Sequence, residues 1–159
     1  MPRIIPNLWF DLESPRGRRV LRLGVPELED HRNPALRRGR PREGGTVMTV
    51  DFTLDGQRVT AINGGSQFTF DEAISLLIEC ADQDEVDYHW SKLTEGGEEG
   101  PCGWLKDRFG LSWQVVPVGM EKLLADPDTA RGQRAMQAML DMRKIDVAAL
   151  YAAADQSSG

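Results

Sequence analysis

The stretch TVMTVDFTLDGQRVTAIN, residues 46–63, alternates apolar and polar side chains on both sides of a central Asp-Gly pair. Alternation with a period of two is typical of a β-strand that buries one face. Asp55-Gly56 is a favoured pair for a two-residue hairpin turn, because that turn needs positive φ at both positions. We therefore predict a β-hairpin made of residues 46–54 and 57–63, and with it a β-sheet.

Further strands and helices are predicted on both sides of this hairpin. Residues 4–10 and 74–80 are short, apolar runs that indicate strands. A helix is expected to begin after Asp82, where Glu85 completes a capping box, and to end before Gly96. The elements expected after it are strands at 103–107 and 111–116 and helices at 120–125, 130–143 and 147–154. This order predicts an α+β protein with a helical carboxy-terminal tail.

Length and composition bound the class of protein. The chain has 159 residues, of which 40% are hydrophobic and 28% charged, enough for one domain with a core that needs no disulfides. No run of 18 apolar residues is available for a transmembrane helix, and the amino terminus lacks the apolar stretch of a signal peptide. Two cysteines do not make a disulfide framework. We expect a soluble, cytoplasmic protein.

The net charge of −6 is the sum of two unlike parts. Residues 12–42 hold nine arginines, no lysine and four acids, a net of +5, whereas the rest of the chain has a net of −11. The basic part also holds four of the nine prolines and no aromatic residue. It could be a basic arm for nucleic acid or a poorly packed insertion. The lack of aromatic side chains to stack on bases favours the insertion, so we expect no nucleic-acid partner.

Motifs for the common catalytic chemistries are missing from the sequence. It contains no P-loop, no G-x-G-x-x-G after a strand, no H-E-x-x-H and no C-x-x-C. The two histidines, His31 and His89, leave few bases for a catalytic triad and exclude a zinc site of several histidines.

Two other features leave alternatives open. Cys102, followed by Lys106, is a candidate reactive thiol with a lowered pKa, or else a small residue in a tight turn. Trp9, Trp104 and Trp113 lie on predicted strands, where they either belong to the core or line a ligand pocket.

Four strings carry a family resemblance: PNLWFD at 6–11, GTVMTVDF at 45–52, NGGSQF at 63–68 and TEGGEEGPCGWLKDRFG at 94–110. They resemble the PhnB-like branch of the vicinal-oxygen-chelate superfamily, which includes glyoxalase and bleomycin-resistance proteins. The branch is often labelled a 3-demethylubiquinone-9 3-methyltransferase domain. The match covers residues 4–11 and 44–150, and the string at 94–110 is the most specific part.

The resemblance implies paired βαβββ modules that form a curved mixed sheet around a cleft, usually within a homodimer. In one domain of residues 1–159, residues 4–63 would form the first module, 74–116 the second, and 117–155 the carboxy-terminal helices. The first module needs a helix and a strand at residues 12–43, where nothing matches the family. We therefore expect the first module to be damaged there.

A change of reading frame accounts for this segment. The family's first helix usually runs into a stretch like FYVSVFPNSRITEIR. Written in GC-rich codons and translated from the third base of its first codon, this stretch gives LRLGVPELEDHRNP, which is residues 21–34. We hypothesise that residues 14–43 are a frameshifted family segment, with the frame restored near Gly44. The coding DNA tests this, because an alternative frame must then encode a family-like peptide.

The resemblance also bears on metal chemistry. Metal-dependent members of the superfamily hold a divalent ion with His, Glu or Gln side chains from four strands. The matching positions fall near Asn7, Asn63, Ser75 and Gln114. The last is the clearest, since DRFGLSWQ at 107–114 resembles the superfamily's D-P-D-G-x-x-x-E with Gln114 in place of the glutamate. Neutral amides and a serine are poor ligands for a catalytic divalent metal.

We therefore expect a metal-free protein with no cofactor that binds a small molecule in the cleft. The residues expected to line it are Asn7, Trp9, Asn63, Ser75, Trp104 and Gln114. The alternative is an enzyme of the superfamily, either a metal-dependent lyase, isomerase or dioxygenase, or a methyltransferase as the label suggests. A methyltransferase needs a nucleotide-cofactor site, and no glycine-rich strand-helix turn provides one. A third alternative is that the damaged first module leaves a non-functional product.

Overall fold

The computed structural model describes residues 4–11 and 49–156, which fall into two compact units, residues 1–69 and 70–159. The predictions about residues 12–43, including the frameshift and the missing helix of the first module, lie outside the described residues. The described parts combine strands and helices, so the prediction of an α+β protein is confirmed.

The first unit contains a mixed three-stranded sheet of β1 (Asn7–Phe10), β2 (Thr49–Leu54) and β3 (Gln57–Asn63). Strand β3 lies in the middle, parallel to β1 and antiparallel to β2. The predicted hairpin is confirmed, because β2 and β3 are joined by Asp55 and Gly56 with φ of 42° and 76°. Positive φ at both positions is what the Asp-Gly pair predicted.

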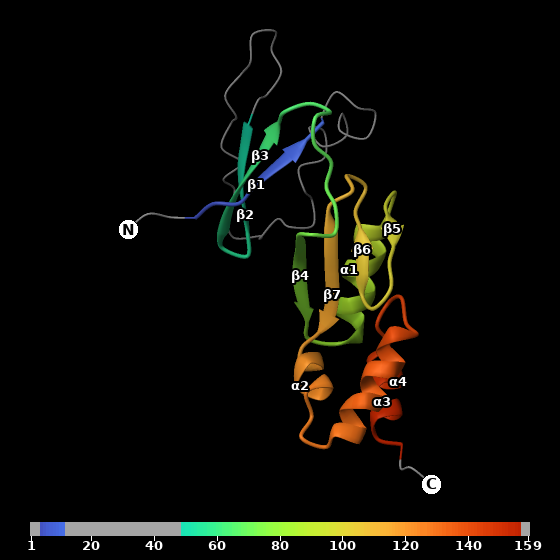
Figure 1. Ribbon diagram of the computed structural model, residues 1–159. Helices are drawn as coiled ribbons and strands as arrows, with labels where there is room; N and C mark the ends of the chain where they lie inside the picture. The colour runs from blue at the N-terminus through green and yellow to red at the C-terminus, as the bar shows by residue number, and fades with distance from the viewer. Residues whose placement is uncertain (1–3, 12–48, 157–159) are drawn as a thin grey trace, which may run out of the picture. The chain divides into compact units, whose positions relative to one another are not determined.

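The second unit begins with a βαβββ module (Figure 1). Its elements are β4 (Ser75–Cys80), α1 (Gln83–Thr94), β5 (Glu98–Glu99), β6 (Trp104–Lys106) and β7 (Ser112–Pro117). The sheet has the order β4-β7-β6-β5, in which β4 and β7 are parallel and the other pairs antiparallel. The strands and helix from Ser75 to Pro117 therefore follow the order βαβββ.

Helix α1 starts almost as its sequence predicts. The Asp82 carboxylate accepts the backbone N–H of Glu85 at 3.0 Å. The Glu85 carboxylate reaches one residue further back than in a capping box and accepts the N–H of Ala81 at 2.8 Å. Val86 and Trp90 are buried on the side of the helix that packs against the sheet.

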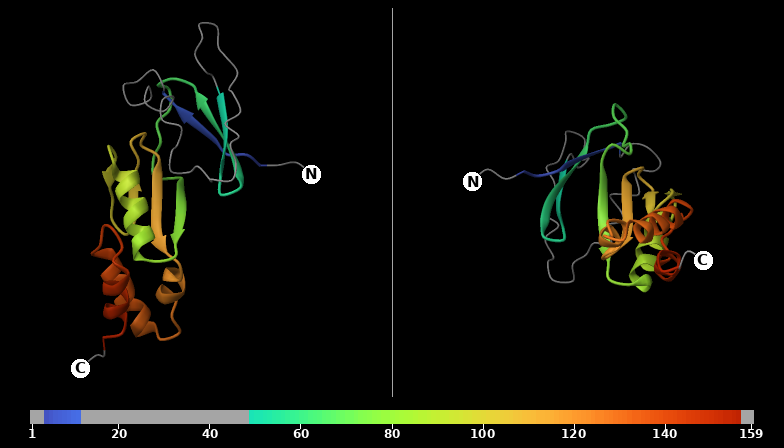
Figure 2. Two further views of the ribbon diagram at one scale, coloured as in Figure 1. Left: turned by 180° about the vertical axis from the view of Figure 1, so that it is seen from behind. Right: turned by 60° about the horizontal axis from the view of Figure 1, so that its bottom comes forward.

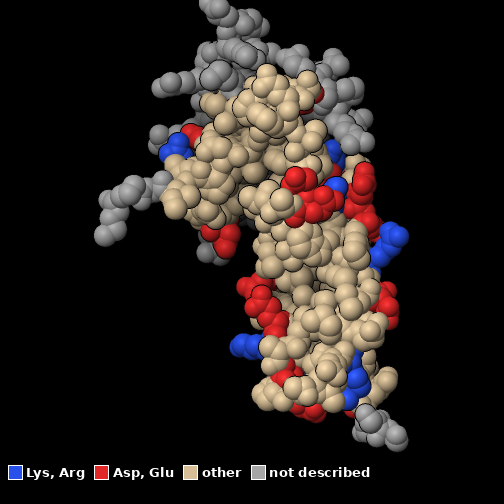
Figure 3. Space-filling model, in the orientation of Figure 1, with Lys and Arg blue, Asp and Glu red and all other residues tan. Residues whose placement is uncertain are grey.

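The two faces of this sheet differ. Helix α1 lies behind the sheet in Figure 1 and in front of it in the reverse view of Figure 2. The buried side chains of the module include Cys80, Val86, Trp90, Leu105, Trp113 and Val115. The opposite face is open, and Leu77 on it is 49% exposed. Figure 3, in the orientation of Figure 1, shows uncharged surface over the middle of this face.

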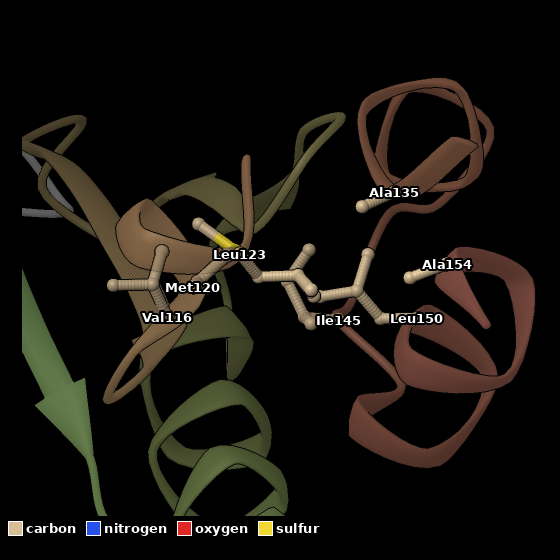
Figure 4. Packing of buried hydrophobic residues seen from close by; sticks show 7 residues of the cluster. All are labelled: Val116, Met120, Leu123, Ala135, Ile145, Leu150 and Ala154. Atoms are coloured by element: carbon tan, nitrogen blue, oxygen red, sulfur yellow. The ribbon is translucent and has the colours of Figure 1, made fainter. Parts of the chain in front are cut away.

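The carboxy-terminal helices α2 (Met120–Leu124), α3 (Thr129–Leu140) and α4 (Val147–Ala154) extend the core of the second unit. Figure 4 shows their cluster, which consists of Val116, Met120, Leu123, Ala135, Ile145, Leu150 and Ala154. Val116 belongs to β7, so the cluster is continuous with the sheet. None of the helices within residues 4–11 and 49–156 is long and apolar enough to cross a membrane.

Helix α3 ends at Leu140, three residues before its predicted end. The carbonyl oxygens of Met142 and Arg143 accept the N–H groups of Cys102 and Gly103 at 2.8 and 2.7 Å. The N–H groups of Asp141 and Met142 donate to the carbonyls of Ala138 and Met139, three residues back, so the α-helical pattern of hydrogen bonds ends here. The chain that follows the helix is bonded to the turn at residues 100–103 instead.

Candidate functional site

The open face of the second unit carries two rows of side chains across β4, β7 and β6. Residues directly opposite each other in paired strands point to the same face of the sheet. The strand register therefore places Ser75, Ser112 and Lys106 in one row and Leu77, Gln114 and Trp104 in the next. Three of the residues predicted from the sequence, Ser75, Trp104 and Gln114, are thus brought together on one surface.

Ser75 and Gln114 form a polar pair at the centre of this face. The side-chain amide of Gln114 donates to the Ser75 hydroxyl oxygen at 2.9 Å. With the amide so oriented, the Gln114 carbonyl oxygen can accept a further hydrogen bond and the Ser75 hydroxyl can donate one. The pair therefore offers an acceptor and a donor side by side.

The sequence left open whether the strand tryptophans belong to the core or line a ligand pocket. The structure answers differently for Trp104 and Trp113. Trp113 is buried, and its indole N–H donates to the Asp107 carboxylate at 3.0 Å. Trp104 is only partly buried, and its indole N–H has no hydrogen-bond partner among the described residues. Trp113 therefore belongs to the core, whereas Trp104 adds a flat aromatic surface beside Gln114.

A charged cluster closes one end of the open face. Lys106 forms an ion pair with Glu72 at 2.5 Å, and this hydrogen bond is the main cause that raises the pKa of Lys106. Glu98 and Asp71 act on the ammonium in the same direction. The Ser112 hydroxyl donates to the backbone carbonyl of Asp71 at 3.3 Å, so residues 71–72 cover the end of the first row. Three carboxylates around one ammonium leave this end of the site negative.

This cluster was not predicted from the sequence. Glu72 and Lys106 lie far apart in the chain, and only the pairing of β4, β7 and β6 brings them together. The acids at 71–72, shortly before the strand at 75–80, were the one local signal.

Asp107 was also not predicted from the sequence as an important residue. Its carboxylate stabilises the turn before β7. Its carboxylate accepts the backbone N–H groups of Phe109 and Leu111 at 2.8 and 3.0 Å, in addition to the indole of Trp113. Loss of solvent around the carboxylate raises the pKa of Asp107, although these hydrogen bonds act against the rise. An aspartate that binds the N–H two residues ahead is typical of an Asx-turn, and Asp107-Arg108-Phe109-Gly110 could have indicated one.

In the first unit the pairing register separates the predicted residues. Trp9 lies opposite Ile62 and Phe10 lies opposite Asn63, so Asn63 faces away from the side of β1 that carries Asn7 and Trp9. The prediction that Trp9 and Asn63 line one surface is not met in this sheet, because the strand period of two turns them to opposite faces.

The side chain of Trp9 is held by the turn that follows β3. Its indole N–H donates to the carbonyl of Gly65 at 2.9 Å, and its ring meets the Phe68 ring edge-on at 5.1 Å. A Cβ at Gly64 would lie 2.0 Å from the indole ring, so only glycine allows this packing. Asn7 is exposed and donates to the carbonyl of Ile5 at 2.9 Å.

The two cysteines are free thiols in different surroundings. Cys80 is buried, and burial raises the pKa of its thiol to about 11. Cys102 lies in the turn before β6 with φ of 57°, and its N–H is bonded to Met142. Lys106, which the sequence offered as a partner for this thiol, is paired with Glu72 instead. A reactive thiol at Cys102 stays a prediction.

The donor groups do not fit a divalent metal. Ser75 and Gln114 are hydrogen-bonded to each other, and Asn7 and Asn63 face opposite sides of their sheet. None of these four groups is a carboxylate or an imidazole. Within the part of the chain that the structure describes, no three or more His, Cys, Asp or Glu residues gather where they could hold a metal ion.

The sequence profile of the 3-demethylubiquinone-9 3-methyltransferase family matches residues 2–116. The chain belongs to this family. A PhnB protein from Bacillus cereus has a similar structure, with 25% identity and a TM-score of 0.54 over 74% of this chain and 100% of that one. A Pseudomonas aeruginosa protein matches over 74% and 98% of the two chains, with 16% identity and a TM-score of 0.49. No curated protein sequence matches. The resemblance stated from the sequence is confirmed, and the family match ends where the carboxy-terminal helices begin.

Proposed function

We propose that this PhnB-like family member binds a small neutral molecule, without a metal, on the open face of the β4-β7-β6 sheet. The observation that supports this most directly is the hydrogen-bonded Ser75–Gln114 pair beside the partly exposed ring of Trp104. A donor and an acceptor next to an aromatic surface are the usual elements of a small-molecule site.

The chemistry of the face indicates the class of ligand. A planar ring would stack on the Trp104 indole, and a group with one acceptor and one donor side by side, such as an amide, would complement Ser75 and Gln114. The carboxylates around Lys106 disfavour an anion. We therefore expect a neutral ring compound that carries an amide or a similar pair of polar atoms.

The activity in the family's name is a weaker candidate for this chain. A methyl transfer needs a bound methyl donor, and in nucleotide-binding folds the turn from the first strand into the helix is rich in glycine. Here the turn from β4 into α1 is Ala81-Asp82, with Asp84 and Glu85 in the first turn of the helix. Its residues favour capping of α1 over the binding of a nucleotide-type cofactor.

Benzamide is a suitable probe, because it combines a flat ring with one amide and does not chelate metals. Titration into ¹⁵N-labelled protein should shift the indole N–H signal of Trp104 and leave that of Trp113 in place. A fragment of this size binds with a dissociation constant on the order of 1 mM. Gln114→Leu should abolish the shift, whereas Gln137→Leu on the exposed side of α3 should not. Benzoate, an anion of the same shape, should bind more weakly.

Two outcomes would contradict the proposal. One is a Trp104 signal that no benzamide concentration moves. The other is a stoichiometric divalent metal in the purified protein, measured by elemental analysis, which would contradict the proposal that the ligand binds without a metal. We also propose that the protein is a cytoplasmic homodimer, and light scattering of the purified chain tests the dimer.

A further inference from the structure

A small hollow with an apolar wall and a charged rim lies next to the polar pair on the same face. It has a volume of about 170 Å³ and lies between β4, the end of β7 and the start of α2. Its lining consists of the apolar residues Leu77, Val116, Pro117, Val118 and Met120, together with Gly119 and the charged residues Glu79, Glu121 and Lys122. All of these residues belong to the second unit.

The hollow begins where the proposed ligand site ends. Leu77 lines the hollow and lies directly opposite Gln114 in the strand register. Val116 follows Gln114 by two residues on β7, which puts it on the same face about 7 Å further along the strand. A ligand whose amide meets Gln114 therefore needs only a short extension to reach the hollow.

The walls of the hollow are fixed by backbone interactions. The N–H of Val118 donates to the carbonyl of Cys80 at 2.8 Å, which joins the ends of β7 and β4. Gly119, with φ of 87°, then turns the chain into α2, where Met120 and Leu123 are packed in the core. Even so, Leu77 and Val118 remain 49% and 58% exposed. This is apolar surface that an apolar group of a ligand could cover.

We infer that the ligand of this face carries a short apolar arm, of about three to five carbons, which lies in the hollow formed by Leu77, Val116 and Val118. The inference rests on the proposed function, because it extends the same site. Its size estimate follows from the volume, since a cavity of about 150 Å³ lined by aliphatic side chains holds a molecule as large as benzene.

A series of benzamides with methyl, ethyl, propyl and butyl groups at the ring position meta to the amide tests this inference. Each added carbon that enters the hollow should tighten binding about two- to fourfold, and the gain should stop once the hollow is full. Val118→Asp places a charge on the apolar wall of the hollow at an exposed position, so it should flatten the series and leave the affinity for benzamide unchanged. Leu140→Asp, at a similarly exposed site on α3, should leave the whole series as in the wild type.

The outcomes separate the two proposals. If benzamide binds but the affinity does not rise with chain length, the inference of an apolar arm is wrong and the proposed function stands. If the affinity of Val118→Asp still rises with chain length, the inference of an apolar arm in this hollow is also wrong, because the alkyl group then lies elsewhere. If benzamide itself does not bind, the proposed function is wrong, and so is the inference of an apolar arm that rests on it.

Discussion

Trp113 and Trp104 lie on neighbouring strands of one sheet and point to opposite faces. Trp113 lies under α1, buried and bonded to Asp107, whereas Trp104 lies on the open face beside Gln114 with no hydrogen-bond partner in the described chain. The two residues have the same chemistry, and only their place in the strand register differs. The covered face holds the module together, and the open face leaves its polar groups accessible.

The glycine-rich string at residues 94–110 mainly holds the module together. A Cβ at Gly97 would lie 2.1 Å from the carbonyl oxygen of Lys106, and one at Gly100 would lie 2.8 Å from that of Trp104. Asp107 organises the turn before β7. Of the residues proposed to meet the ligand, Ser75 and Gln114 lie outside the string. Within this string only Trp104 belongs to the proposed ligand site, and the glycines and Asp107 have structural parts.

The largest expected contrast is between alanine substitutions of the two tryptophans. Trp113→Ala should lower the free energy of unfolding by about 4 kcal/mol, because it leaves a cavity under α1 and removes a donor from Asp107. Trp104→Ala should lower it by about 1 kcal/mol or less, since the ring is partly exposed. Urea unfolding of both variants measures the difference. Equal losses would mean that the two faces do not differ as described.

A second contrast tests the structural part of the 94–110 string. Gly103 has φ of 81°, and a Cβ there would lie 2.8 Å from the carbonyl oxygen of Val115. Gly103→Ala should therefore cost about 3 kcal/mol, from backbone strain and overpacking together. Gly110→Ala is the matched control, because Gly110 has φ of 84° with nothing within 4 Å, and it should cost about 1 kcal/mol. If both variants lost the same stability, close packing at Gly103 would have no effect.

Much of the second unit could be predicted from local sequence. The capping residue Asp82 marked the start of α1, and apolar runs marked β4 and β7. The end of α3 could not be predicted, because it depends on hydrogen bonds to the distant turn at residues 100–103. Local patterns locate elements, but contacts between elements fix some of their ends.

The candidate site was predictable only in part. Gln114 was found through its place in a family motif, and the strand pairing brings it to Ser75 and Trp104. The ion pair between Glu72 and Lys106 was missed, because the register of three strands decides it. For Trp9 and Asn63, the sequence predicted a position on a strand but not the face of the sheet, and a shift of one residue changes the face.

The third prediction concerns Asp107 and pH. Burial raises the pKa of this carboxyl, so the folded protein holds its proton more tightly than the unfolded chain does. The contribution of Asp107 to stability is then largest at low pH and falls as the pH rises through the folded-state pKa. Asp107→Asn should cost about 2 kcal/mol near pH 7, because its amide cannot satisfy both the backbone donors and the Trp113 indole.

Because asparagine does not titrate, the gap in unfolding free energy between wild type and Asp107→Asn should widen as the pH is lowered from about 7 towards about 4. Urea unfolding at several pH values measures it, and the titration of other groups cancels in the difference. A gap that narrows towards acid would show that the hydrogen bonds outweigh burial at this carboxyl.

The smallest expected change in stability is at Ser75, and it separates the two faces most sharply. Ser75→Ala removes the acceptor of the Gln114 amide, but water can replace the hydroxyl on an open face, so the cost should be about 0.5 kcal/mol. Benzamide binding should nevertheless weaken about tenfold, because the ligand loses a donor and Gln114 is free to turn. Unfolding and the Trp104 indole signal measure the two effects in one sample. A core residue loses stability and function together, so a variant that keeps stability and loses affinity identifies this face as a place for a ligand. Unchanged affinity would remove Ser75 from the site and leave Gln114 and Trp104 to be tested alone.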